Sequence, residues 1–232
     1  MASDARFAGF SRDAIQFMRD LADNNDRAWF QPRKADYERL LKEPMEQLCV
    51  ALAQRFEARG IPLHADPRSS PFRIYRDTRF SGDKSPYKTH LAATFPWIDV
   101  ASAGPGDRAH GNGGYFNFQP GDMYVGGGMW QPDRPRQDAF RDAVRDDPER
   151  VEQALHDPDF VAWFGGAHGH EELKRVPVGY PADHRLADMF RWKGIVFGKR
   201  LTDRQVCSPK LPDLLADGYA AAVPVFGFLA TL

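Results

Sequence analysis

The sequence has few cysteines and no long apolar run, and each shortage excludes a class of protein. Only Cys49 and Cys207 occur among its 232 residues. Two cysteines supply neither a disulfide framework nor the spacing of a zinc finger, so we expect free thiols. Every apolar run is far shorter than the roughly 20 residues that a membrane span requires, and the start lacks the apolar segment of a signal peptide. We therefore expect a cytoplasmic protein with no membrane partner.

The chain also lacks a large net charge and the familiar catalytic motifs. Its formal net charge of -1 argues against a protein that coats nucleic acid with a basic surface. The sequence contains no Gly-x-Ser-x-Gly elbow, no phosphate loop ending in Gly-Lys-Ser or Gly-Lys-Thr, and no Cys–His pair at a known catalytic spacing. We expect no metal and no cofactor. Whether the protein is an enzyme, and its oligomeric state, stay open.

Helical periodicity occupies both ends of the chain. Ser11 is a good N-cap for a first helix, whose apolar stripe contains Ile15 and Met18. Asn25 is predicted to cap the next helix, and Gly60 to end a third helix that starts near Pro44. Further helices are predicted in the second half of the chain, at residues 132–146, 149–155, 158–164, 183–192 and 213–222.

The middle of the chain reads as strands and loops. Short aromatic or β-branched runs between Gly and Pro predict strands at residues 72–78, 91–98, 115–118, 123–127, 172–177 and 195–201. Residues 101–114 contain five glycines and no apolar pattern, which predicts an exposed loop. With 42% hydrophobic residues the chain is able to build a core. We predict one α+β domain over residues 1–232, with N-terminal helices, a central largely antiparallel sheet and C-terminal helices.

Residues 72–90 concentrate positive charge. Five cations less two anions leave a net charge of +3 in this segment, from Arg73, Arg76, Arg79, Lys84 and Lys88 against Asp77 and Asp83. In a strand Phe72, Ile74 and Arg76 would share one face, because side chains alternate. We therefore predict a buried Arg76 that is paired with a carboxylate, Asp83 being the candidate.

The same segment predicts an anion site. A turn at Gly82 and Pro86 would bring its cations together with hydroxyl donors, which suits an anionic small molecule or a nucleic-acid phosphate. The candidate ligand-binding residues are Arg73, Arg79, Lys84, Tyr87, Lys88 and Trp130. His90, whose ordinary pKa lies near neutrality, and Asp77 are the candidates for proton transfer. The alternative is a non-catalytic module in which these charges form an internal salt-bridge network.

The glycine run before Trp130 allows two interpretations. Glycines at residues 126–128 would let a ligand approach the backbone, with Trp130 as a wall of its site. They would equally suit a bulge where the sheet packs on a helix. The run lacks the spacing of a dinucleotide-binding fingerprint.

Five segments carry a resemblance to a known family. They are FAGF at 7–10, NNDRAWF at 24–30, FRIYRDTRFSGDKSPYKTH at 72–90, VGGGMWQP at 125–132, and LKRVPVGY with DH at 173–184. Together they resemble the bacterial and fungal family called domain of unknown function 2461 over nearly the whole chain. The resemblance implies a single α+β domain with no established activity. It does not extend to the glycine-rich stretch at 101–114.

Overall fold

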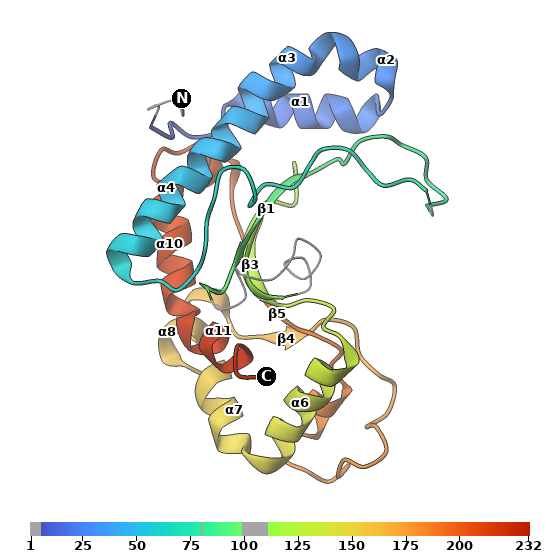
Figure 1. Cartoon of the computed structure of the whole chain (residues 1–232), viewed down its shortest axis with the longest axis vertical. Coiled ribbons are helices and arrows are strands. Elements are labelled where there is room, and N and C mark those ends of the chain that lie inside the picture. Colours follow the sequence, from blue (N-terminus) through green and yellow to red (C-terminus); the bar gives the residue numbers. More distant parts are fainter. Residues whose placement is uncertain (1–5, 80, 99–110) are drawn as a thin grey trace.

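A computed structural model describes residues 6–79, 81–98 and 111–232. Figure 1 shows helices of the N-terminal third at one end, a sheet in the middle and helices of the C-terminal half around the other end. One continuous cluster of buried apolar side chains joins these parts. The fold is therefore the predicted single α+β domain.

The first helix begins where its cap residue predicts. α1 (Arg12–Asp23) starts at Ser11, whose hydroxyl accepts a hydrogen bond from the Ala14 amide at 3.1 Å. The prediction for the second helix was wrong by one residue. α2 (Arg27–Phe30) is capped by Asp26, whose carboxylate accepts from the Trp29 amide at 2.8 Å. Asn25 is left for another role, described below.

One long helical segment follows α2. It comprises η1 (Gln31–Arg33), α3 (Lys34–Tyr37), the π-helical turn η2 (Glu38–Lys42) and α4 (Glu43–Arg59) (Figure 1). Pro44 lacks an N–H and cannot donate to the carbonyl four residues earlier, which accounts for a wider turn at this point. Gly60 ends α4 with the predicted left-handed conformation, at φ 63°.

The sheet has five strands, and each pairs antiparallel with its neighbours. In chain order they are β1 (Leu91–Pro96), β2 (Asn112–Phe118), β3 (Tyr124–Met129), β4 (His168–Gly169) and β5 (Ile195–Arg200), and their order in space is β1-β2-β3-β5-β4. The loop predicted at 101–114 was wrong at its end, because residues 112–114 begin β2. Residues 101–110 of that prediction lie outside the described part of the chain.

Two predicted strands are absent from the described residues. Residues 72–78 run beside β1 but form only isolated bridges, Pro71 with Ala93 and Tyr75 with Tyr87. Residues 172–177 form one bridge, from Glu172 to Trp192. Both segments contain prolines or long charged side chains, and neither has a full-length partner strand whose ladder would keep it extended.

Helices cover one face of the sheet. Phe116 on this face is fully buried, and the helices against it include α4, α10 (Leu211–Ala221) and α11 (Val223–Leu229). A Cβ atom at Gly127 would lie 2.8 Å from the Phe226 ring of α11. This close approach favours the packing interpretation of the glycine run. Tyr115 and Gly126 alternate with these residues and lie on the opposite face, which we call the open face.

The remaining helices lie in the second half of the chain. They are α6 (Arg134–Asp146), α7 (Pro148–Leu155), α8 (Pro158–Phe164), η4 (Ala187–Arg191) and α9 (Asp203–Val206). The helix predicted at 183–192 is reduced to the short 3-10 helix η4, and α9 and α11 were not predicted. No helix in the described ranges is long and apolar enough to cross a membrane.

Candidate functional site

Residues 72–79 and 81–90 form two limbs of an extended segment that we call the basic arm. Its first residues hydrogen-bond to the free edge of β1, with the Phe72 amide 2.9 Å from the Ala92 carbonyl oxygen. The chain then leaves the sheet and returns, and the Lys88 amide donates to the Ile74 carbonyl at 2.7 Å. Figure 1 shows the arm projecting beyond the sheet on the side of α1 and α2.

Asn25 and an aromatic stack hold the base of the arm. The Asn25 side-chain amide donates to the Tyr87 carbonyl oxygen at 3.0 Å and accepts from the Tyr87 amide at 3.1 Å. The Tyr87 ring is buried and stacks on Phe30 with 4.1 Å between the ring centroids. The arm is therefore fixed to the α1–α2 turn by two hydrogen bonds and by a core aromatic residue.

The cations at the tip of the arm are occupied by neighbouring groups. Arg76 donates to Asp83, the partner that the sequence suggested, and Arg79 forms an ion pair with Asp77 at 2.7 Å. The Lys84 ammonium donates to the Thr78 carbonyl at 2.9 Å. The predicted burial of Arg76 was wrong, because 28% of its side chain is exposed.

Hydrogen bonding at the tip stabilises the charged carboxylates. The Ser85 hydroxyl and Arg76 donate to Asp83 and hold its pKa well below the ordinary range. Hydrogen bonds from Arg79 lower the pKa of Asp77 to about 2. A carboxylate with so low a pKa is a weak base, so Asp77 is poorly suited to accept a proton at neutral pH.

Three basic side chains at the base of the arm lack such partners. Within the described residues, Arg73, Lys88 and His90 form no hydrogen bond or ion pair through their side chains. Lys88 is half-buried, and its ammonium lies 5.0 Å from the centroid of the Phe72 ring. Burial and the like charge of Arg73 lower the pKa of Lys88. Burial and the charge of Lys88 lower the pKa of His90, so its imidazole is mostly neutral at pH 7.

Aromatic rings continue from Lys88 onto the open face of the sheet. The Phe72 ring lies 6.4 Å from the Tyr115 ring, which in turn lies 5.7 Å from the Tyr124 ring. Burial raises the pKa of both tyrosines, which therefore stay neutral and act as hydrogen-bonding groups. The base of the arm thus combines two cations, a neutral imidazole and an aromatic wall.

The other predicted site residues lie elsewhere. Tyr87 points into the core, and its ring is not placed to contact a ligand. Trp130 follows β3 at the end of the sheet away from the arm, and its ring lies 5.3 Å from that of His170. The structure therefore brings together Arg73, Lys88 and His90 but not Trp130.

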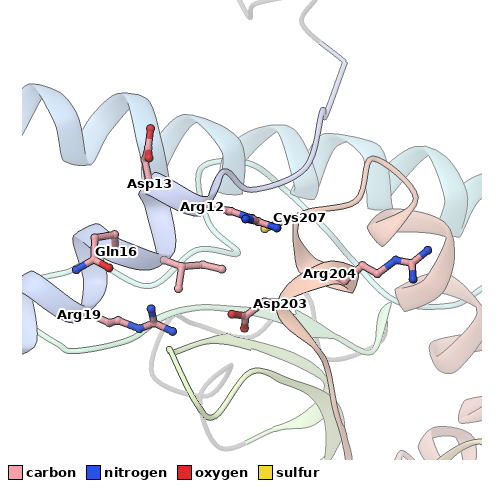
Figure 2. A pocket seen from close by; sticks show the side chains of 8 residues that line it. Arg12, Asp13, Gln16, Arg19, Asp203, Arg204 and Cys207 are labelled. Atoms are coloured by element: carbon pink, nitrogen blue, oxygen red, sulfur yellow. The ribbon is translucent and has the colours of Figure 1, made fainter.

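A pocket of about 750 Å³ lies between α1 and α9. Its lining comes from the two ends of the chain, namely from Arg12, Asp13, Ile15, Gln16 and Arg19 on α1 and from Asp203, Arg204 and Cys207 in and after α9. Figure 2 shows these side chains around the pocket. Sequence reasoning missed this pocket, because no local pattern connects residues that are so far apart in the chain.

These features define a class: an α+β protein with a five-stranded antiparallel sheet and a basic arm along one edge. A family model described as "Conserved hypothetical protein (DUF2461)" matches residues 13–228, so the chain belongs to this family, as the sequence motifs indicated. No curated protein and no solved structure matched the chain. The family description gives no activity, and the function has to be argued from the residues.

Proposed function

We propose that the base of the basic arm binds a phosphate-bearing anion through Arg73 and Lys88, with His90 beside it. The observation that supports this proposal is a half-buried lysine next to an arginine, with neither side chain paired to a described carboxylate. Two adjacent cations repel each other, and the lowered pKa of Lys88 reports that repulsion together with its burial. An anion bound between them would relieve the repulsion and stabilise the fold.

The charge of this site matches that of a phosphate monoester. Arg73 and Lys88 together carry two positive charges, and a phosphate monoester carries roughly -1.5 to -2 at pH 7. Arginine suits the planar oxygen pairs of phosphate, while lysine acts as a point charge. The tip cations add little, because Asp77 and Asp83 already neutralise Arg79 and Arg76.

His90 is the group that would make the site catalytic. A neutral imidazole has one nitrogen that accepts a proton and one that donates a hydrogen bond. It is therefore suited to take a proton from a nucleophile that attacks the bound phosphoryl group. We keep His90 as the candidate for proton transfer and set Asp77 aside, because its pKa of about 2 makes it a weak base.

The second candidate function is an interaction module in which the arm has only a structural role. The observation that favours it is the pairing at the tip, where Arg76 and Arg79 both have carboxylate partners. For either function we propose the cytoplasm as the location, because two free cysteines suit a reducing compartment.

The two functions are separated by measuring phosphate binding calorimetrically in wild type and in matched variants. Inorganic phosphate and phenyl phosphate are titrated at constant ionic strength, with sodium chloride as the reference. Lys88→Met removes one cation and keeps an apolar chain, and it should weaken binding about tenfold or more, since a charge-assisted hydrogen bond contributes about 1.5–3 kcal/mol. Arg79→Gln, at the tip, should change the affinity by less than about twofold.

Two results would defeat the anion proposal. Wild type that binds neither phosphate would leave the structural module as the function. Equal losses of phosphate affinity in Lys88→Met and Arg79→Gln would show that the tip of the arm contributes to binding as much as its base does.

A further inference from the structure

The pocket between α1 and α9 is separate from the basic arm, and its charges are distributed differently. Arg12 and Arg19 stand seven residues apart on α1, which places them two helical turns or about 10 Å apart along one face. α9 forms the opposite side of the pocket. Figure 2 shows Arg19 and Asp203 pointing toward one another, and Arg12 and Cys207 overlap in this view.

The charged side chains of the pocket are not paired. None of Arg12, Arg19 and Asp203 forms an ion pair or a side-chain hydrogen bond with any residue that the structure describes. Elsewhere in the described chain arginines do find carboxylates across long separations, as Arg55 does with Asp213 at 2.7 Å. The pocket therefore keeps its hydrogen-bonding groups available for a ligand.

Cys207 belongs to the lining of the pocket, and charged groups from both walls act on its thiol. Asp203 raises the pKa of the Cys207 thiol and Arg12 lowers it, after the larger effect of burial, which raises it. A carboxylate and a guanidinium both act on this one sulfur atom. A ligand seated between Arg12 and Asp203 would therefore also cover Cys207.

The charge balance of the lining selects the class of ligand. Three arginines less two aspartates leave one positive charge around the pocket. A carboxylate brings one negative charge and matches the fork of a guanidinium, whereas a phosphate monoester brings nearly two and would lie close to Asp203. Ile15 is the one aliphatic side chain in the lining, and only 4% of it is exposed.

We propose that the α1–α9 pocket binds a small organic carboxylate, held by Arg12 and Arg19. This site is distinct from the phosphate site of the basic arm and does not depend on it. Its occupancy has a direct readout, because Cys207 lies in the pocket and the other cysteine, Cys49, is fully buried with a raised pKa.

The test is the rate at which iodoacetamide labels Cys207, followed by peptide mass spectrometry. The probe is butyrate, and the control ligand is butyramide, which has nearly the same shape and no charge. At ten times its dissociation constant butyrate occupies about ten elevenths of the sites and should slow labelling about tenfold. Butyramide, inorganic phosphate and sodium chloride at equal ionic strength should leave the rate within about twofold.

Matched variants locate the effect. Arg12→Gln and Arg19→Gln should each lose most of the protection by butyrate, measured as the ratio of labelling rates with and without the ligand. Arg27→Gln, an exposed arginine of α2, should keep it, as should Lys88→Met in the basic arm. The ratio corrects for any change that Arg12→Gln makes in the intrinsic reactivity of the thiol.

The proposal is overturned if butyrate and butyramide slow labelling equally, or if neither slows it at concentrations up to about 1,000-fold above the protein. It is also overturned if both arginine variants keep the wild-type protection ratio. None of these results bears on phosphate binding by the arm, because that site is measured by calorimetry with another ligand and another variant.

Discussion

The basic arm and the α1–α9 pocket show two different ways of presenting positive charge. The arm is contiguous in sequence and dense in cations, yet Arg76 and Arg79 are neutralised by Asp83 and Asp77 a few residues away. The pocket takes its arginines from residues 12, 19 and 204, and the fold leaves them without carboxylate partners in the described structure. The charge that is free to bind a ligand thus depends on what folding leaves unpaired, not on the number of cations in a motif.

The largest effect should come from removing the ring that holds the arm. Tyr87→Ala deletes a fully buried ring stacked on Phe30 and should lower the free energy of unfolding by about 3–5 kcal/mol. It should also abolish phosphate binding by releasing the arm, while Cys207 labelling keeps its butyrate protection. Urea denaturation together with the two binding assays checks this. A loss of both binding activities at equal folded fraction would contradict the separation of the two regions.

Asn25→Ala should have the next largest effect. The substitution removes both side-chain hydrogen bonds to the Tyr87 backbone, and each partly buried group left unsatisfied costs about 1–3 kcal/mol. We expect the free energy of unfolding, measured with denaturant, to fall by about 2 kcal/mol. Hydrogen exchange in the arm should become faster. Asn24→Ala is the matched control, since Asn24 bonds only within α1 at the Asp20 carbonyl. Equal losses in the two variants would show that Asn25 has no special role in holding the arm.

Arg76→Met should lower the free energy of unfolding by less than the removal of a buried charge would. The Arg76 side chain is 28% exposed and Asp83 is 59% exposed, so the pair is mostly screened by solvent. Exposed pairs contribute about 0–1 kcal/mol, and we expect a loss of about 1 kcal/mol in thermal unfolding. Arg141→Met is the comparison. It removes a buried guanidinium that donates to the Phe190 carbonyl, and it should lower the free energy of unfolding by more than Arg76→Met does. A reversed order would contradict the burial of these two arginines.

The elements that local chemistry determines were predictable, and those that depend on distant partners were not. The Ser11 cap and the Gly60 stop follow from single residues, and β1 and β5 follow from short apolar runs. Residues 72–78 alternate like a strand, but their partner is only the edge of β1 and the returning limb of the arm. A strand assignment needs a neighbouring strand, which the sequence does not reveal.

The candidate site follows the same rule. Composition identified residues 72–90 as cationic, and our anion proposal rests on Arg73 and Lys88. Which cations stay unpaired depends on side-chain geometry, as when Lys84 turns back to the Thr78 carbonyl. The role of Asn25 was hidden because Asn and Asp are both good helix caps and the adjacent Asp26 takes that position.

The smallest predicted effect is the contribution of His90 to the pH dependence of the free energy of unfolding. Its pKa lies below the ordinary value of 6.5 because of burial and Lys88, so the folded state binds fewer protons than the unfolded state between these two pKa values. His90 should therefore make the free energy of unfolding rise with pH through that window. Lys88→Met should narrow the window by raising the pKa of His90. The measurement is the free energy of unfolding as a function of pH. His64→Gln, which removes a histidine outside the arm, is the control substitution.

Anion binding at Arg73 and Lys88 should be visible in the pKa of His90, measured by NMR titration with and without phosphate. A phosphate bound beside the imidazole favours its protonated form, so we expect saturating phosphate to raise the pKa of His90 in wild type and in Arg79→Gln. At the same phosphate concentration the pKa of His90 should rise less in Lys88→Met, because that variant binds phosphate more weakly. A His90 pKa that is identical with and without phosphate in the wild-type protein would show that no anion binds beside Lys88.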